Sequence, residues 1–235
     1  MEAGGLAAAL DDRGEAVAVA MVRSINLLSV EVDRPATDAW FFERADEHAD
    51  AVFYGPPRLV THLDDAAVSE VGRLYRQLGL AGDVLDLMSS WVSHFDPPPE
   101  RLTVLGMNAV ELARNPAATA RVVHDLNADP QLPFADESFD AVTCCVSIDY
   151  LVEPVEVLTD VARVLRPGGQ CALTFSNRCF PTKAIRGWLA ASETGRVDIA
   201  RSYFDATGAF ETVHAELRNP GRRGDPLYAV WATRR

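Results

Sequence analysis

The chain of 235 residues has little positive charge and no long hydrophobic run. Lysine and arginine together number 22, against 34 aspartates and glutamates, so the net charge is −12. A duplex nucleic acid or an anionic membrane surface requires a basic protein face, and neither is expected as a partner. No stretch approaches the roughly 18 apolar residues of a membrane span. The N-terminus lacks the basic start and apolar centre of a signal peptide, so a cytoplasmic protein is expected.

Cysteine is also scarce. The four cysteines show none of the spacings typical of a metal site, and no metal is predicted. Three of them fall in apparent core strands, so reduced thiols are the ordinary interpretation. Nothing in the sequence determines the oligomeric state.

Glycine is missing from one turn where the pattern favours it. Val84-Leu85-Asp86-Leu87 is an apolar run that ends in a polar turn, and a helix is expected after this turn. An α/β protein forms a nucleotide pocket in this way, at the carboxyl end of its first central strand. Glycines in such a turn let the backbone approach the ligand. Met88, Ser90 and Val92 stand at those places, so the sequence predicts a pocket with an unusual lining.

Strand-like and helix-like stretches alternate through the middle of the chain. Strands are expected at 83–87, 102–106, 121–126, 140–147 and 170–175, and helices at 38–51, 66–78, 109–115 and 154–165. Apolar strands alternating with helices indicate a parallel sheet covered on both faces. Two final strands, 210–217 and 226–233, flank a Pro/Gly/Arg turn and predict an antiparallel hairpin. The expected fold is therefore α/β and Rossmann-like, with a mainly parallel seven-stranded sheet and a terminal antiparallel hairpin.

Four segments carry a resemblance to a known family. They are Val84–Leu87, Leu132–Asp140, Val164–Gly169 and Asp225–Trp231. With these segments the chain resembles the class I S-adenosylmethionine-dependent methyltransferases, in their type 11-like small-molecule branch. The resemblance implies S-adenosyl-L-methionine over the carboxyl ends of the first two strands, and a small-molecule substrate beneath a cap. It also implies an N-terminal extension or cap at 1–57 and a methyltransferase domain at 58–235.

The resemblance places the cofactor against the loops that follow the first four strands. The residues implied are Asp86, Met88, Ser89, Ser90, Met107, Asn108, Asp125, Leu126, Asn127 and Ser147. Asn108 stands where the family has an acidic residue that holds the ribose hydroxyls. Because a charge-assisted hydrogen bond is stronger than a neutral one, Asn108→Asp is expected to tighten cofactor binding by about tenfold.

Structural alternatives remain open for several of these residues. Asp86 either approaches the cofactor's ammonium group or organises the loop. Ser89 and Ser90 either bind the methionine carboxylate or cap a helix. Asp125 and Asn127 either contact adenine or form an Asx turn.

Catalytic and substrate-binding residues are expected around the same pocket. Asp149 and Tyr150 follow the fourth strand, where they would orient or deprotonate the acceptor; the alternative is a helix N-cap. His94, on the pocket loop, is the third catalytic candidate. The substrate-binding candidates are Tyr54, Arg58, His62, Asn177, Arg178 and Lys183. For the last three, which follow the fifth strand, the alternative is a solvated loop.

Two functions fit the sequence. The first is methyl transfer from S-adenosylmethionine to a small-molecule acceptor. The second is a non-catalytic member of the same fold that acts as a binding or regulatory partner, which the missing glycines favour. A pocket filled by Met88 and Trp91 would favour the second. A nicotinamide dehydrogenase fits less well, because its pyrophosphate depends more strictly on the glycine-rich turn.

Overall fold

The computed structural model describes residues 9–10, 16–17, 39–221 and 223–235. Most of the predicted N-terminal extension therefore lies outside the described residues. The chain divides into two units, Met1–Arg34 and Pro35–Arg235. In the first unit, β1 (Ala9–Leu10) pairs antiparallel with β2 (Ala16–Val17). The second unit contains everything described below, including residues 39–57.

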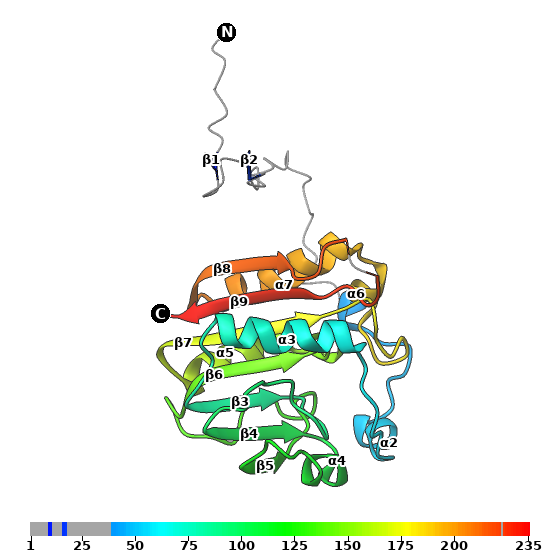
Figure 1. The fold of residues 1–235 in the computed structure, drawn as a ribbon. Helices are drawn as coiled ribbons and strands as arrows, with labels where there is room; N and C mark the ends of the chain where they lie inside the picture. The colour runs from blue at the N-terminus through cyan, green and yellow to red at the C-terminus, as the bar shows by residue number, and fades with distance from the viewer. Residues whose placement is uncertain (1–8, 11–15, 18–38, 222) are drawn as a thin grey trace. The chain divides into compact units, whose positions relative to one another are not determined.

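Seven strands form one sheet in the second unit (Figure 1). They are β3 (Asp83–Leu87), β4 (Arg101–Gly106), β5 (Ala120–Val123), β6 (Phe139–Cys145), β7 (Leu165–Phe175), β8 (Phe210–Leu217) and β9 (Tyr228–Arg234). Their order across the sheet is β5-β4-β3-β6-β7-β9-β8. The first five in this order are parallel, whereas β9 runs antiparallel to both β7 and β8. The predicted fold class is confirmed.

Helices cover both faces of this sheet. They are α1 (Ala39–Phe42), α2 (Asp50–Tyr54), α3 (Asp65–Gln77), α4 (Ala109–Ala113), the 3₁₀ helix η1 (Ile148–Tyr150), α5 (Pro154–Val164), α6 (Arg186–Ala190) and α7 (Glu193–Thr207). In Figure 1, α3 crosses in front of the sheet and α5 and α7 lie behind it. No helix among the described residues is long and apolar enough to cross a membrane.

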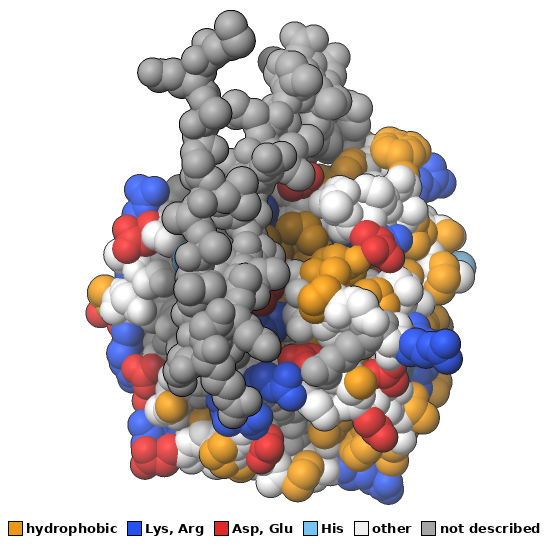
Figure 2. All heavy atoms as spheres, turned by 45° about the horizontal axis from the view of Figure 1, so that its top comes forward, with side chains coloured by type: hydrophobic (Ala, Val, Ile, Leu, Met, Phe, Trp, Pro, Cys, Tyr) orange, Lys and Arg blue, Asp and Glu red, His pale blue; other side chains and the backbone are white. Residues whose placement is uncertain are grey.

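Two apolar clusters, one on each face, hold these layers together. Val71 and Leu74 of α3 belong to the first, with Val84 of the sheet. Val157 and Val161 of α5 belong to the second. Each fully buried side chain of this kind contributes about 1.5–3 kcal/mol, so the two faces supply most of the stabilising free energy. On the described part of the surface in Figure 2, acidic and basic side chains are interspersed.

The strands lie close to their predicted positions, with the largest differences at the start of β7 and the end of β5. The helix expected after the turn that follows β3 is wrong, because a loop without a helix joins β3 to β4. β7 begins at Leu165, five residues before the predicted start. β5 ends at Val123, because the backbone N–H groups of Asn127 and Ala128 donate to the carboxylate of Asp125 and form a turn. This Asx turn is the structural alternative that the sequence left open for Asp125.

The single helix predicted over 38–51 is wrong. Two short helices, α1 and α2, stand in its place. Between them Arg44 forms a β-bridge with Ile185, and the N–H of Arg186 donates to the carbonyl of Glu43. These contacts with the segment after β7 hold the chain out of a continuous helix.

The strand order also fixes where a ligand can bind. The chain leaves β3 toward β4 on one side and later returns to β6 on the other side of β3. In an open α/β sheet the crevice at such a switch point, outside the carboxyl ends of the strands, is the ordinary binding site.

Candidate functional site

A cavity of about 440 Å³, the main cavity, opens at the carboxyl ends of the parallel strands. This volume lies within the range of about 300–1,000 Å³ typical of small-molecule sites. Of the predicted cofactor residues it is lined by Met88, Ser89, Ser90, Met107, Asn108, Asp125, Leu126, Asn127 and Ser147. The fold therefore brings together the loops after β3, β4, β5 and β6.

The loop after β3 keeps part of a glycine turn's geometry without glycine. Met88 adopts a left-handed backbone conformation, with φ of 51°. This conformation costs a non-glycine residue about 1–2 kcal/mol. The next residue, Ser89, donates its N–H to the carbonyl of Leu105 at 2.8 Å. A Cβ built on Gly106 would overlap the carbonyl oxygen of Ser89. The glycine that permits the close backbone approach therefore lies at the end of β4.

Asp86 organises this loop. Its buried carboxylate accepts hydrogen bonds from Ser89 Oγ at 2.6 Å, Ser93 Oγ at 2.6 Å and Thr143 Oγ1 at 2.7 Å. Such bonds offset the cost of placing a carboxylate in an apolar strand. Asp86 does not line the main cavity; it lines a second cavity of about 70 Å³, together with Trp91 and other residues of the loop.

Asn108 is fully engaged by the protein. Its Oδ1 accepts from the N–H groups of Val110 at 3.0 Å and Glu111 at 3.2 Å, which caps α4. Its Nδ2 donates to the carbonyls of Tyr54 and Gly55, both at 2.9 Å, which fastens the end of α2. An amide offers two donors and one oxygen with two lone pairs, so no capacity is left for a ribose hydroxyl. The predicted tightening of cofactor binding by Asn108→Asp requires a free side chain and is therefore wrong in its premise.

Glu111 is an acidic residue of the main cavity that the sequence analysis missed. Its carboxylate accepts from Ser90 Oγ at 2.5 Å and from the N–H of Arg58 at 2.6 Å. It lies on α4, three residues after the N-cap Asn108, at the capping-box position where glutamate is favoured. The spacing of three residues between Asn108 and Glu111 is the sequence feature from which Glu111 could have been recognised. Here the side chain turns to the cavity instead of back to the N-cap.

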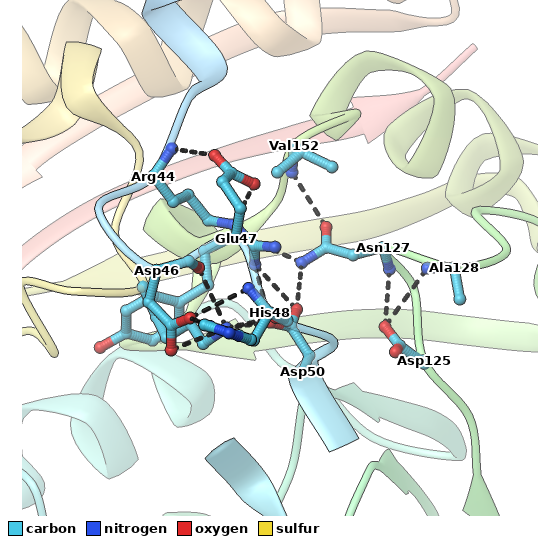
Figure 3. Close-up of polar contacts among 11 residues, drawn as sticks. Arg44, Asp46, Glu47, His48, Asp50, Asp125, Asn127, Ala128 and Val152 are labelled. Atoms are coloured by element: carbon cyan, nitrogen blue, oxygen red, sulfur yellow. Dashed lines mark hydrogen bonds and ion pairs between the residues drawn. The ribbon is translucent and has the colours of Figure 1, made fainter. Parts of the chain in front are cut away.

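An ion-pair cluster, formed by Arg44, Asp46, His48, Asp50, Asn127 and Lys183, borders the cavity. Arg44, Asp50 and Lys183 are its buried members, whereas His48 is exposed. In Figure 3 the side chains of Arg44 and Asn127 both point to the carboxylate of Asp50. Asp50 accepts from Arg44 Nη1 at 2.8 and 2.9 Å and from Asn127 Nδ2 at 2.8 Å. It also pairs with Lys183 Nζ at 3.0 Å. Burial alone would raise the pKa of Asp50, but the hydrogen bonds from Asn127, Arg44 and Lys183 bring that pKa below its ordinary value.

This cluster changes the placement of two predicted residues. Asn127 lines the cavity, yet its amide also donates to the carbonyl of Tyr150 and accepts from the N–H of Val152. Its side chain is therefore already bonded where adenine was expected. Lys183 is completely buried and does not line the cavity. Its ammonium donates to the carbonyls of Asp46 and His48, so the predicted substrate contact is replaced by a structural one.

The other predicted substrate residues do line the main cavity: Tyr54, Arg58, His62, Asn177 and Arg178. Arg178 Nε is paired with Asp225 Oδ1 at 2.8 Å. The cavity also includes residues that were not predicted: Asp50, Thr61, Leu105, Gly106, His124, Val146, Leu151, Cys179, Phe180 and Pro181. Many are apolar or lie in loops without a pattern, so the sequence offered little signal for them.

The three catalytic candidates are placed differently. Tyr150 lines the main cavity, and its hydroxyl accepts from the N–H of Phe180 at 2.9 Å. Asp149 is buried and does not line the cavity; burial raises its pKa to about 7, and its Oδ2 has no hydrogen-bond partner among the described residues. His94 lines only the second cavity, and burial lowers its pKa.

Comparisons with known proteins agree with this arrangement. A family model described as "Methyltransferase domain" matches residues 92–173, beginning at Val92 within the loop that lacks glycine. Methyltransferase GfsG of Streptomyces halstedii is 28% identical over 153 residues, covering 57% of this chain and 55% of that protein. Demethylmenaquinone methyltransferase of Mycobacterium sp. (strain KMS) is 48% identical over 56 residues, covering 22% and 24%. The chain thus matches about half the length of these relatives at most.

A solved structure shows the fold. A SAM-dependent methyltransferase from Archaeoglobus fulgidus superposes with a TM-score of 0.52 at 13% identity, covering 69% of this chain and 91% of that one. The resemblance drawn from the sequence motifs is confirmed at the level of the matched segment and the fold: residues 92–173 match a methyltransferase family model, and the fold is that of solved S-adenosylmethionine-dependent methyltransferases. The cofactor of that family is S-adenosyl-L-methionine, as predicted.

Proposed function

We propose that the protein transfers a methyl group from S-adenosyl-L-methionine to a small-molecule acceptor in the main cavity. The observation that carries the proposal is that the loops after four parallel strands border one cavity at the switch point. Trp91 does not fill this cavity; its indole Nε1 donates to the carbonyl of Val60 at 3.1 Å. The four free cysteines support a cytoplasmic location.

The cofactor would be held by a different set of side chains from the set that the sequence predicted. Met107, which follows β4, and Leu126, which follows β5, offer apolar surface to the adenine. Glu111 replaces Asn108 as the acid for the ribose. A carboxylate has about four acceptor positions, and two of those on Glu111 are used by Ser90 and Arg58. Because Glu111 lines the cavity, the remaining two would accept from the ribose hydroxyls.

The protein's own part in the chemistry is chiefly alignment. When bound, the cofactor supplies an electrophilic methyl group on sulfur, and in-line displacement requires the acceptor atom to be held close to it. Tyr150 is proposed to orient the acceptor, because its hydroxyl accepts from Phe180 and donates to no described residue. Asp149 does not line the main cavity, so no proton transfer is assigned to it.

Titration calorimetry with S-adenosylmethionine and S-adenosylhomocysteine tests the proposal. We expect one molecule to bind per chain. Glu111→Gln should weaken binding by about tenfold, since a charge-assisted bond becomes a neutral one. Glu156→Gln, at an exposed position on α5, is the matched control and should leave the affinity unchanged. Absence of binding for both ligands would overturn the proposal.

The second candidate function is that of a binding protein with this fold and no methyl transfer. The engaged amides of Asn108 and Asn127 favour it, because the family's polar contacts with the cofactor are not available from them. The same titration separates the two functions. A chain that binds neither ligand, yet retains its fold by circular dichroism, supports the second.

A further inference from the structure

One side of the main cavity is built from four rings, which we call the ring wall: Tyr54, His62, Tyr150 and Phe180. The centroid of the Phe180 ring lies 5.2 Å from that of His62, 6.0 Å from that of Tyr150 and 6.5 Å from that of Tyr54. The rings come from α2, from the segment after α2, from η1 and from the loop after β7. They offer flat apolar surface to a ligand, with edges and faces in several orientations.

Arg58 adds a positive charge to this side of the cavity. Its guanidinium carbon lies 4.5 Å from the centroid of Phe53 and 5.5 Å from that of Phe180. Contact with ring faces stabilises an arginine and fixes its plane. Among the described residues, its side chain makes no ion pair, and its one hydrogen bond is a long one of 3.4 Å to the carbonyl of Pro56.

The other cations at or beside the cavity are already paired. Arg44 and Lys183 are held by Asp50, and Arg178 is held by Asp225. Arg58 is therefore the cation left to bind an anion in the described part of the cavity. Its fork of N–H donors matches the two oxygens of a carboxylate.

Tyr54 adds a neutral donor close to the same rings. Its hydroxyl oxygen is buried and has no hydrogen-bond partner among the described residues. Burial raises the pKa of Tyr54 above its ordinary value, so the hydroxyl keeps its proton. A buried donor without a partner is costly, and a ligand oxygen would remove that cost.

We propose that the main cavity binds an aromatic carboxylate, with its ring against the ring wall and its carboxylate on Arg58. A second oxygen on the ligand accepts from the Tyr54 hydroxyl. The claim that this aromatic carboxylate is the methyl acceptor rests on the proposed function. The claim that the cavity binds such a ligand rests on the four rings, the unpaired guanidinium of Arg58 and the unpartnered hydroxyl of Tyr54.

Three matched probes test the binding site on the full chain by calorimetry. 4-Hydroxybenzoate carries the ring and the charge, 4-hydroxybenzamide carries the ring alone, and 4-hydroxycyclohexanecarboxylate carries the charge on a saturated ring. We expect 4-hydroxybenzoate to bind about tenfold or more tightly than either of the other two. Equal binding of the saturated acid, or no binding of any probe, overturns the inference.

Two arginine variants test whether the guanidinium of Arg58 binds the carboxylate of the ligand. Arg58→Gln should weaken 4-hydroxybenzoate by about tenfold or more and leave 4-hydroxybenzamide unchanged, which also shows that the variant is folded. Arg201→Gln, at an exposed arginine on α7, is the control and should change neither. If Arg58→Gln weakens S-adenosylhomocysteine instead, then Arg58 binds the cofactor's carboxylate and the assignment is wrong.

The two proposals fail separately. Binding of 4-hydroxybenzoate without binding of S-adenosylhomocysteine contradicts the proposed methyl transfer and leaves the aromatic-acid site in place. Binding of S-adenosylhomocysteine without preference among the probes contradicts the aromatic-acid site alone.

Discussion

Replacing Asn108 by aspartate introduces the carboxylate that the family resemblance implies at this position, yet we expect the change to lower both stability and cofactor affinity. The amide donates to the carbonyls of Tyr54 and Gly55, at 2.9 Å each. A carboxylate has no proton to donate and would face two carbonyl oxygens. The helix cap survives, because aspartate accepts from the first N–H groups of a helix as well as asparagine does.

The magnitude follows from the two lost bonds. A carbonyl left without its donor costs about 1–3 kcal/mol when it is buried. Gly55 is exposed and Tyr54 is partly buried, so both values belong near the lower end. Together with the repulsion of the new charge, we expect the free energy of unfolding to fall by about 2–4 kcal/mol. Because α2 is no longer fastened to the cavity, the affinity for S-adenosylhomocysteine should fall as well.

Denaturant unfolding and calorimetry measure the two effects. Asn219→Asp is the matched control: Asn219 is also buried, donates to the carbonyl of Asp225 and accepts from the N–H of Leu227 in the β8–β9 turn. It should lower stability and leave the affinity nearly unchanged. For Asn108→Asp, the deficit should shrink at acidic pH, where the new carboxyl group regains a donor. A variant that binds tenfold more tightly at unchanged stability would refute the reasoning.

Three further predictions concern other parts of the site. Gly106→Ala places a Cβ against the carbonyl of Ser89, so the affinity for S-adenosylhomocysteine should fall by about tenfold or more; an unchanged affinity in calorimetry would contradict this. Lys183, the single lysine, should resist amine-reactive reagents, and Asp50→Asn should speed its modification by about tenfold or more; equal rates by peptide mass spectrometry would show that Asp50 does not hold the cluster closed. Burial raises the pKa of Asp149 from 3.8 to about 7, so the free energy of unfolding of the parent should fall by up to about 4 kcal/mol as pH rises through this range. Asp149→Asn should not show this fall. If the free energies of unfolding of parent and variant change in parallel between pH 4 and 8, the prediction is refuted.

The sequence by itself determined the sheet and the place of the cavity. Strands such as Asp83–Leu87 and Arg101–Gly106 are buried on both faces, so their runs of apolar residues indicate them locally. The alternation with helices implies parallel pairing, and parallel strands place their following loops at one edge. Residues after four strands therefore line one cavity even though the turn at Met88 lacks glycine.

Only the tertiary structure decided what the polar side chains do. Asn108 and Asn127 were correctly placed at the cavity, but their hydrogen bonds go to segments far away in the chain, such as Asp50, which lies 77 residues before Asn127. Periodicity describes neighbours within one element and carries no information on such partners. The same reason explains the error over 38–51, where contacts from beyond β7 replace a local helix.

Helices α6 and α7 were not predicted, and Glu111 was not recognised as a residue of the cavity. In α7 only Ala200, Tyr203 and Phe204 are buried, so the pattern that marks a helix from sequence is weak. Glu111 occupies an ordinary capping position, and only the folded chain brings Ser90 and Arg58 to its carboxylate. The burial pattern of a helix or strand can be recognised in its own sequence, whereas the contacts that define a site form between segments that only the folded chain brings together.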